Sequence, residues 1–169
     1  MKVLLIGANG QLGADLLKVF QAAGDTVVPT THAQLDVCSE AQIAKAMSEV
    51  EPDVILNTAA FHRVDECETN CVPAFQVNGI AVMYLAKAAK AAGATLVHYS
   101  TDYVFGGYEK GSPYDETDLP APVNVYGTSK VVGEHLIAAY TTAISPSGRV
   151  VCTESPAAAA RAATLSKLC

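Results

Sequence analysis

The stretch that decides the fold is "KVLLIGANGQLGADLLKVFQAAG", residues 2–24. It begins with a short apolar run, continues through glycines at positions 7, 10 and 13, and then places large apolar side chains at helical spacing as far as Gly24. Such a run is typical of a buried strand, and glycine is the residue that most often ends a helix. The stretch therefore predicts a strand, a glycine-rich turn and a helix, in that order.

The same alternation continues along the chain. Further apolar runs predict strands over residues 25–30, 52–60 and 94–100, and helical patterns occupy residues 39–50, 74–92 and 126–140. Ser39, followed by Gln42 three positions later, is a capping-box pattern that supports a helix start. Continuously apolar strands that alternate with helices predict an α/β fold with a doubly wound parallel sheet, the Rossmann fold.

The pattern divides the chain at about residue 140. We expect residues 1–140 to form one domain, with residues 101–122, rich in Gly, Pro, Asp and Tyr, as a long functional loop. Residues 141–169 mix small polar residues, one short apolar run and an alanine stretch. They predict an atypical tail, either weakly structured or a short terminal helix with little apolar surface to bury.

Composition and charge exclude several classes of protein. The 169 residues carry a formal net charge of −6, whereas a nucleic-acid-binding domain needs a basic face. The apolar run at the N-terminus is too short for a signal peptide, and none approaches the roughly 20 residues of a membrane helix. Five cysteines, an odd number at irregular spacings, favour free thiols in a reducing cytoplasm and no metal site.

The glycine loop "GANGQLG", residues 7–13, indicates nucleotide binding. Gly7 permits a tight turn, Gly10 lets the backbone approach a phosphate, and Gly13 allows close contact between helix and strand. A pyrophosphate would then meet the helix N-terminus, where free N–H groups and the helix dipole favour an anion. The spacing differs from the usual G-x-G-x-x-G, so the position between strand and helix, more than the glycines themselves, favours a nucleotide site over a simple turn.

The end of the second predicted strand bears on which nicotinamide nucleotide would bind. It reads "VVPTTHAQLD", with Thr31 but no acidic residue before Asp36. Without a carboxylate to repel a 2′-phosphate, we expect the site to accept NADPH, with NADH as an alternative. Asp36 and Val37 either flank the adenine or, in the case of Asp36, cap the next helix.

Two further segments carry groups suited to reducing a carbonyl. Thr101 in "HYSTDYVF", residues 98–105, follows the fourth strand at the sheet edge where ligands bind in parallel sheets. Tyr126 and Lys130 in "NVYGTSK", residues 124–130, share one helix face. Lys130 would lower the pKa of Tyr126 toward the range for proton transfer, and Thr101 would hydrogen-bond the substrate carbonyl. The Tyr–Lys spacing alone is weak evidence, but its place after the glycine loop and fourth strand favours the catalytic interpretation. His98 is interpreted as a core residue.

The segments "GANGQLG", "PDVILNTAAFHRVDECE", "HYSTDYVF" and "NVYGTSKVVGEH", in this order, resemble the dTDP-4-dehydrorhamnose reductase family of the extended short-chain dehydrogenase/reductases. The resemblance covers residues 1 to about 138. It implies an NAD(P)-binding Rossmann domain over residues 1–140. It also implies reduction of the 4-keto group of dTDP-4-dehydro-L-rhamnose, a dTDP-sugar substrate, to dTDP-L-rhamnose in the cytoplasm, with a homodimer as one expected assembly.

The matching positions define the predicted site. The catalytic group is Thr101, Tyr126 and Lys130. The predicted cofactor-binding residues are Gly7, Gly10, Gln11, Leu12, Gly13, Thr31, Asp36, Val37, Ala59, Ala60, Phe61, Asn78, Tyr126 and Lys130. No residue is predicted to bind a metal.

The chain departs from the family after about Tyr140. Family members continue with further strands and a small C-terminal domain that holds the nucleotide sugar, and residues 141–169 lack that pattern. The expectation is therefore a cofactor-binding half without the substrate-binding domain, and the tail resembles a different reading frame. Two alternatives stay open: an NADP-binding regulatory subunit like that of methionine adenosyltransferase, and an inactive fragment whose exposed sheet edge drives association.

Overall fold

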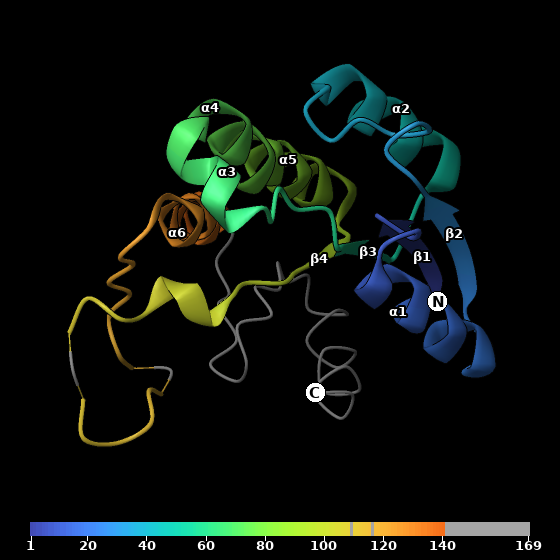
Figure 1. The fold of residues 1–169 in the computed structure, drawn as a ribbon. Helices are drawn as coiled ribbons and strands as arrows, with labels where there is room; N and C mark the ends of the chain where they lie inside the picture. The colour runs from blue at the N-terminus through green and yellow to red at the C-terminus, as the bar shows by residue number, and fades with distance from the viewer. Residues whose placement is uncertain (109, 116, 141–169) are drawn as a thin grey trace.

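A computed structural model describes residues 1–108, 110–115 and 117–140; the predicted tail at 141–169 lies outside them. The sheet contains β1 (Lys2–Ile6), β2 (Thr26–Thr30), β3 (Val54–Asn57) and β4 (Thr95–His98). The strands are ordered β2-β1-β3-β4 and every neighbouring pair is parallel. The predicted α/β parallel sheet of Rossmann type is therefore confirmed (Figure 1).

Helices cover both faces of this sheet. The elements are α1 (Gln11–Ala22), α2 (Glu40–Val50), α3 (Val64–Thr69), α4 (Cys71–Phe75), a π-helical turn (Gln76–Ile80), α5 (Ala81–Ala92), a 3-10 turn (Asp102–Val104) and α6 (Val125–Tyr140). On one face Phe20 of α1 packs on Leu5 and Leu56. On the other, Leu85 and Ile137 join the cluster that α2, α5 and α6 form over the strands (Figure 1). Burial on both faces explains why the strands are continuously apolar.

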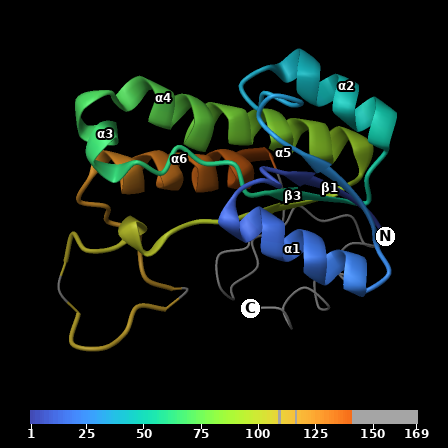
Figure 2. The ribbon, with the colours of Figure 1, turned by 45° about the vertical axis from the view of Figure 1, so that its right-hand side comes forward.

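The predicted helix at 74–92 differs from the observed one. The chain is already helical from Cys71, and a π-helical turn separates α4 from α5, although the two run on as one rod (Figure 2). Gly93, with φ +66°, ends it as predicted. The short helix α3 was not predicted. The predicted capping pattern is confirmed in part, because the Ser39 hydroxyl accepts from the Gln42 N–H while the Gln42 side chain accepts from the Asp36 N–H.

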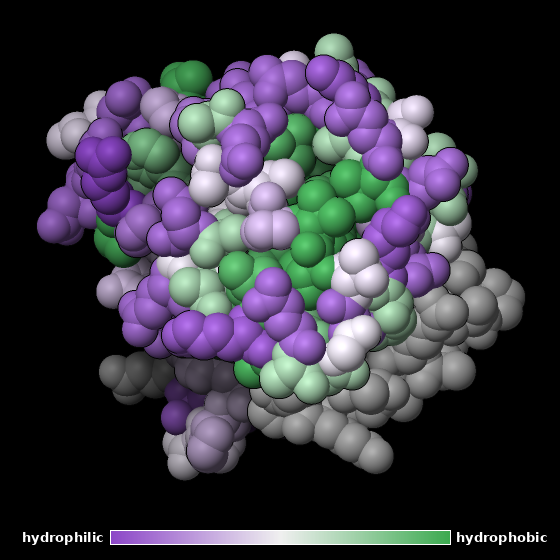
Figure 3. Space-filling model, turned by 90° about the vertical axis from the view of Figure 1, so that its right-hand side faces the viewer, coloured by the Kyte–Doolittle hydropathy of each residue, from purple (hydrophilic) through white to green (hydrophobic). Residues whose placement is uncertain are grey.

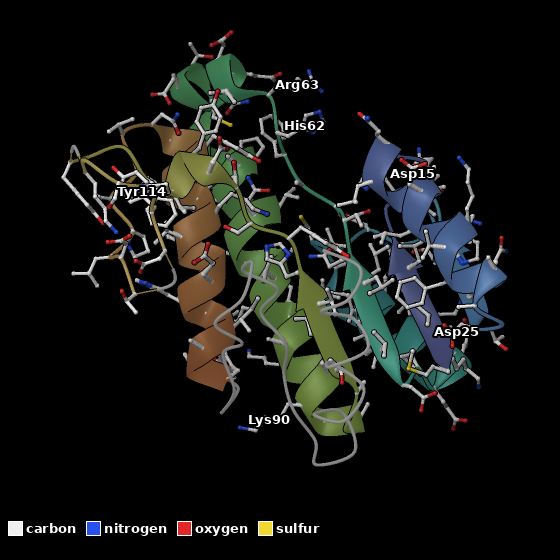
Figure 4. The ribbon with its side chains drawn as sticks, turned by 90° about the horizontal axis from the view of Figure 1, so that it is seen from below. Asp15, Asp25, His62, Arg63, Lys90 and Tyr114 are labelled. Atoms are coloured by element: carbon white, nitrogen blue, oxygen red, sulfur yellow. The ribbon has the colours of Figure 1, made fainter. Side chains whose placement is uncertain are left out.

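The predicted long loop packs on itself. The Ala121 N–H donates to the Val104 carbonyl, and the Gly107 N–H donates to the Ala121 carbonyl. The rings of Phe105 and Tyr114 stack with centroids 4.5 Å apart, and Tyr114 lies within this loop in Figure 4. Apart from the 3-10 turn Asp102–Val104, the described residues of this loop are ordered by such contacts and not by helices or strands.

The strand order places the site. From β1 the chain passes to β2 on one side, and from β2 it crosses to β3 on the other side of β1. The connections that follow β1 and β3 therefore diverge, and in such sheets ligands bind at the carboxyl ends of the two strands. The glycine loop follows β1, and residues 58–63 follow β3.

Candidate active site

The glycine loop is fixed by close backbone contacts. Gly7 has φ +83°, and a Cβ on it would lie 2.7 Å from Thr58 Oγ1. A Cβ on Gly13 would lie 2.3 Å from the Gly7 carbonyl oxygen, which no side chain tolerates. The Gly7 and Ala8 N–H groups both donate to the Thr30 carbonyl, which ties the loop to the end of β2. Glycine is therefore required at both positions.

The start of α1 is suited to an anion. Gly10 is its N-cap and, having no side chain, leaves the amides of the first turn without a side-chain acceptor. Gln11 and Leu12 are exposed in that turn, with Leu12 43% exposed. Twelve residues of helix lie behind these amides. The dipole and the amide donors together favour a phosphate at this point.

The segment after β3 lies beside the glycine loop. The Thr58 hydroxyl donates to the Ile6 carbonyl at 2.7 Å, and the Ala59 N–H donates to Asn57 Oδ1 at 3.2 Å. Ala59, Ala60 and Phe61 follow, all partly exposed. The two small side chains leave the backbone open to a ligand at the place where the sequence predicted cofactor contacts.

Asn78, in the π-helical turn, holds this segment from behind. Its side chain is fully buried: Oδ1 accepts from the Phe61 N–H, and Nδ2 donates to the Phe61 carbonyl and to Ser129 Oγ, each at 2.9 Å. Ser129 in turn donates to the Tyr126 carbonyl at 2.7 Å. Asn78 therefore links the segment after β3 to α6, and both of its Nδ2 protons are already used within the protein.

Thr101 lies near Tyr126. The Thr101 hydroxyl donates to Asp102 Oδ1 at 3.1 Å and accepts from the Tyr103 N–H at 3.3 Å, which fixes its position. Tyr103 packs edge-on against the Tyr126 ring with centroids 5.7 Å apart. Burial raises the pKa of Tyr126, and the nearby Thr101 side chain lowers it by less. The predicted lowering of this pKa is therefore wrong for this arrangement, because desolvation of the phenolate outweighs the favourable contacts.

Lys130 is directed at the end of β4. Only 2% exposed, it has Nζ 3.1 Å from His98 Nε2 and donates to the Tyr99 carbonyl at 2.5 Å. Burial lowers its pKa to about 8, and Glu134, one turn later, opposes that shift. The Lys130 side chain, which was expected to lower the pKa of Tyr126, thus contacts His98 and Tyr99 at the end of β4.

Sequence reasoning missed Asn57 and the contacts of His98 in this region. Asn57 ends β3 and His98 ends β4, and they are partners in the parallel register. Asn57 Nδ2 lies 3.1 Å from His98 Nδ1. His98 is buried, as expected for a core residue, but it also contacts Lys130. The sequence signal that could have indicated this pair is a polar residue at the end of each of two apolar strands.

A family model described as the RmlD substrate binding domain matches residues 1–145. The chain belongs to this family.

Three proteins illustrate the relationship. The dTDP-4-dehydrorhamnose reductase of Burkholderia thailandensis is 46% identical over 138 residues, which make up 82% of this chain and 46% of that protein. The crystal structure of the Bacillus anthracis dTDP-4-dehydrorhamnose reductase in complex with NADP matches with a TM-score of 0.78 at 37% identity, over 83% of this chain and 50% of that one. Thermus thermophilus UDP-glucose 4-epimerase in complex with NAD gives 0.77 at 25% identity, over 83% and 50%. This RmlD-family chain therefore spans about half the length of the relatives it matches.

The remaining predicted cofactor residues of the RmlD-family chain lie after β2. The Thr31 N–H and hydroxyl both donate to Gln34 Oε1, and Asp36 Oδ1 accepts from the Cys38 N–H. Val37 is 5% exposed and packs in the core. Ser39, not Asp36, caps α2, so the capping interpretation of Asp36 is wrong. Thr31 directly follows the carbonyl that anchors the glycine loop, whereas Val37 can offer a ligand only its backbone.

His62 and Arg63 lie at the same end of the sheet as the start of α1 (Figure 4). Both are exposed; Arg63 pairs with Glu66 at 2.7 Å and lies over the Phe61 ring. Within residues 1–108, 110–115 and 117–140, no cluster of three His, Cys, Asp or Glu side chains could hold a metal ion. No helix in that part of the chain is long and apolar enough to span a membrane.

Proposed function

We propose that this chain is the cofactor-binding half of a dTDP-4-dehydrorhamnose reductase, which reduces the 4-keto group of dTDP-4-dehydro-L-rhamnose to dTDP-L-rhamnose. One observation carries the proposal: the glycine loop and Thr101 follow the carboxyl ends of strands β1 and β4 in one parallel sheet, and Tyr126 of α6 lies near Thr101. An anion-binding turn and a proton donor at one sheet edge are what reduction by a nicotinamide nucleotide requires.

A nicotinamide dinucleotide suits the residues present. The cradle formed by Gly7 and Gly13 leaves no room for a Cβ, and the first-turn amides of α1 provide donors for a pyrophosphate. Residues 59–61, beside the glycine loop, and Lys130 of α6 are further residues that would hold the cofactor. When bound, the reduced cofactor supplies hydride. The absence of an acidic residue between Pro29 and Asp36 favours NADPH, and the Bacillus anthracis relative was crystallised with NADP.

The chain's own side chains would handle the carbonyl oxygen. Because burial raises its pKa, Tyr126 is protonated at neutral pH and can give its hydroxyl proton to the oxygen that becomes the alcohol. Thr101, which lies near Tyr126, would orient that oxygen. Lys130 would offset the negative charge left on Tyr126.

Binding is tested first. NADPH and NADH are titrated separately into the purified chain, with nucleotide fluorescence as the signal, and we expect tighter binding of NADPH. Gly10→Asp is the decisive variant, because aspartate caps a helix well yet places a carboxylate against the phosphate. It should retain the fold and lose at least about tenfold in affinity, or about 1.4 kcal/mol. Gly10→Asn, which caps the helix without adding a charge, separates the effect of the carboxylate charge from the effect of helix capping. Absence of NADPH binding to the parent chain would refute the proposal.

Turnover is tested second. With dTDP-4-dehydro-L-rhamnose added, NADPH oxidation is followed for the parent chain and for Tyr126→Phe. The variant should keep NADPH affinity and lose turnover, since it lacks only the proton donor. Equal rates in the two proteins would exclude Tyr126 as the donor. NADPH binding without oxidation in the parent would favour a regulatory nucleotide-binding role over a catalytic one.

A further inference from the structure

The end of the sheet between β3 and β4 holds a buried polar chain. Asn57 and His98 leave the sheet on the same side as Ile55 and Leu96, the side packed by α5 and α6. They are 2% and 1% exposed. Buried polar groups are destabilising unless hydrogen-bonded, so each nitrogen here needs a matching partner.

His98 stands between two nitrogen donors. Asn57 Nδ2 lies 3.1 Å from His98 Nδ1, and Lys130 Nζ lies 3.1 Å from His98 Nε2. Asn57 Oδ1 is occupied by the Ala59 N–H, which favours the amide orientation that turns Nδ2 to the ring. A neutral imidazole has one acceptor nitrogen, and an imidazolium has none. The ring therefore cannot accept from both sides at once.

Two arrangements keep Lys130 hydrogen-bonded to the ring. When Lys130 is an ammonium, Nε2 accepts a charge-assisted hydrogen bond from it, the ring proton sits on Nδ1, and Asn57 Nδ2 gives up its acceptor. When Lys130 is a neutral amine, it accepts from Nε2–H, and Nδ1 accepts from Asn57 Nδ2. Burial and the Lys130 charge both hold the pKa of His98 well below its ordinary value, so the ring stays neutral in both arrangements.

We propose that His98 is a positioning residue that exchanges tautomers with the charge of Lys130, keeping the amine hydrogen-bonded in both of its protonation states. On going from one state to the other, Lys130 loses one proton to solvent, and the single ring proton of His98 changes from Nδ1 to Nε2. The Tyr99 carbonyl holds the ammonium in the first state. The importance of Lys130 rests on the proposed function, whereas the exchange itself requires neither cofactor nor turnover.

The surroundings keep this exchange local. Glu134 acts on Lys130 and raises its pKa, and its carboxylate accepts from the Ser100 hydroxyl. Tyr126, one turn before Lys130 on α6, stays protonated because burial raises its pKa. On β3, Asn57 contributes an uncharged amide. The group that changes charge at near-neutral pH in this cluster is therefore Lys130, and its pKa of about 8 lies in an accessible range.

The parent chain provides the first test. Ring-nitrogen NMR shifts of His98 are followed from about pH 6 to about pH 10, together with the carbon shift of Lys130 Cε. We expect the ring to pass from the Nδ1–H to the Nε2–H tautomer with the same midpoint as Lys130, and without forming imidazolium. In Lys130→Met the ring should keep one tautomer throughout. An unchanged tautomer in the parent, or an imidazolium signal, would overturn the proposal.

Substitution of His98 provides the second test. Glutamine places its amide near the position of Nε2, whereas asparagine reaches only that of Nδ1. His98→Gln should leave the Lys130 midpoint within about half a unit, and His98→Asn should lower it by about one unit, because the buried ammonium loses an acceptor. Equal midpoints in the two folded variants would contradict the proposal. If either variant fails to fold, the parent titration decides.

Discussion

Gly13 shows how one backbone contact fixes the phosphate loop. A Cβ there would lie 2.3 Å from the Gly7 carbonyl oxygen, so Gly13→Ala must push the start of α1 away from β1. We expect a loss of about 1–3 kcal/mol in the free energy of unfolding, measured by urea denaturation. Gly10→Ala is the matched control, because its Cβ would lie 3.3 Å from the same oxygen at an ordinary φ of −76°. Equal losses in the two variants would contradict this explanation.

Lys130 should make stability depend on pH in an identifiable way. Its pKa falls from 10.5 to about 8 on folding. Between these two pKa values the unfolded chain binds more protons than the folded one, so the free energy of unfolding rises with pH in that range. Below the folded-state pKa, the full cost of burying the charged lysine is present. Relative to Lys130→Met, the parent should gain about 3 kcal/mol from about pH 7 to about pH 10.5. The exposed Lys90→Met should follow the parent profile. A constant difference between the parent and Lys130→Met would disprove the shift.

Sequence reasoning named candidate reacting groups more readily than the residues around them. Thr101 and Tyr126 could be proposed because each belongs to a short motif with a defined place in the strand order. The contact of Lys130 with His98 was not, because it depends on the register of β3 and β4 and on the rotation of α6 about its axis. The pKa of Tyr126 was missed for a related reason: the charge of a lysine can be inferred from spacing, but burial cannot.

At the scale of elements, the π-helical turn joins the two parts of the site. Asn78→Ala would leave the Phe61 N–H and carbonyl and the Ser129 hydroxyl without their partner. We expect a loss of about 3 kcal/mol in the free energy of unfolding and weaker NADPH binding, since residues 59–61 lose their anchor. Gln76→Ala, an exposed position of the same turn, should cost less than about 0.5 kcal/mol. Denaturation and nucleotide titration of both variants would test the link.

The helix and strand types were predictable where periodicity was strong, and less so where tertiary contacts decide. Each predicted strand was found, but β3 and β4 end at Asn57 and His98, earlier than the apolar runs suggested. Beyond these residues the backbone turns toward the site and the ladder stops. The π-helical turn was not predicted from periodicity; its buried Asn78 contacts Phe61 and Ser129, 17 and 51 positions away.

At the scale of the whole molecule, the edge of the sheet at β2 bears on whether chains associate. β2 is the outer strand on one side of the described sheet. The face of the molecule toward which this edge turns shows apolar side chains surrounded by hydrophilic ones (Figure 3). Val27 and Val28 are half-buried there, and Pro29 is exposed. An apolar edge strand is a site for unwanted pairing between chains unless something blocks it.

Pro29 blocks that edge. The Thr26 N–H donates to the Met1 carbonyl, and the Thr30 carbonyl accepts from the Gly7 N–H, so the backbone groups of residues 26 and 30 face β1. Because successive residues of a strand alternate, the backbone groups of residues 27 and 29 face away from β1. Proline at position 29 has no N–H to offer at this open edge. Pro29→Val restores a donor on the open edge, and we expect it to associate with rising concentration. Sedimentation velocity should show a shift toward the dimer mass. Thr26→Val increases β propensity on the same strand without adding an outward donor, and should sediment like the parent. If both variants stay monomeric alike, the edge is protected by something other than Pro29.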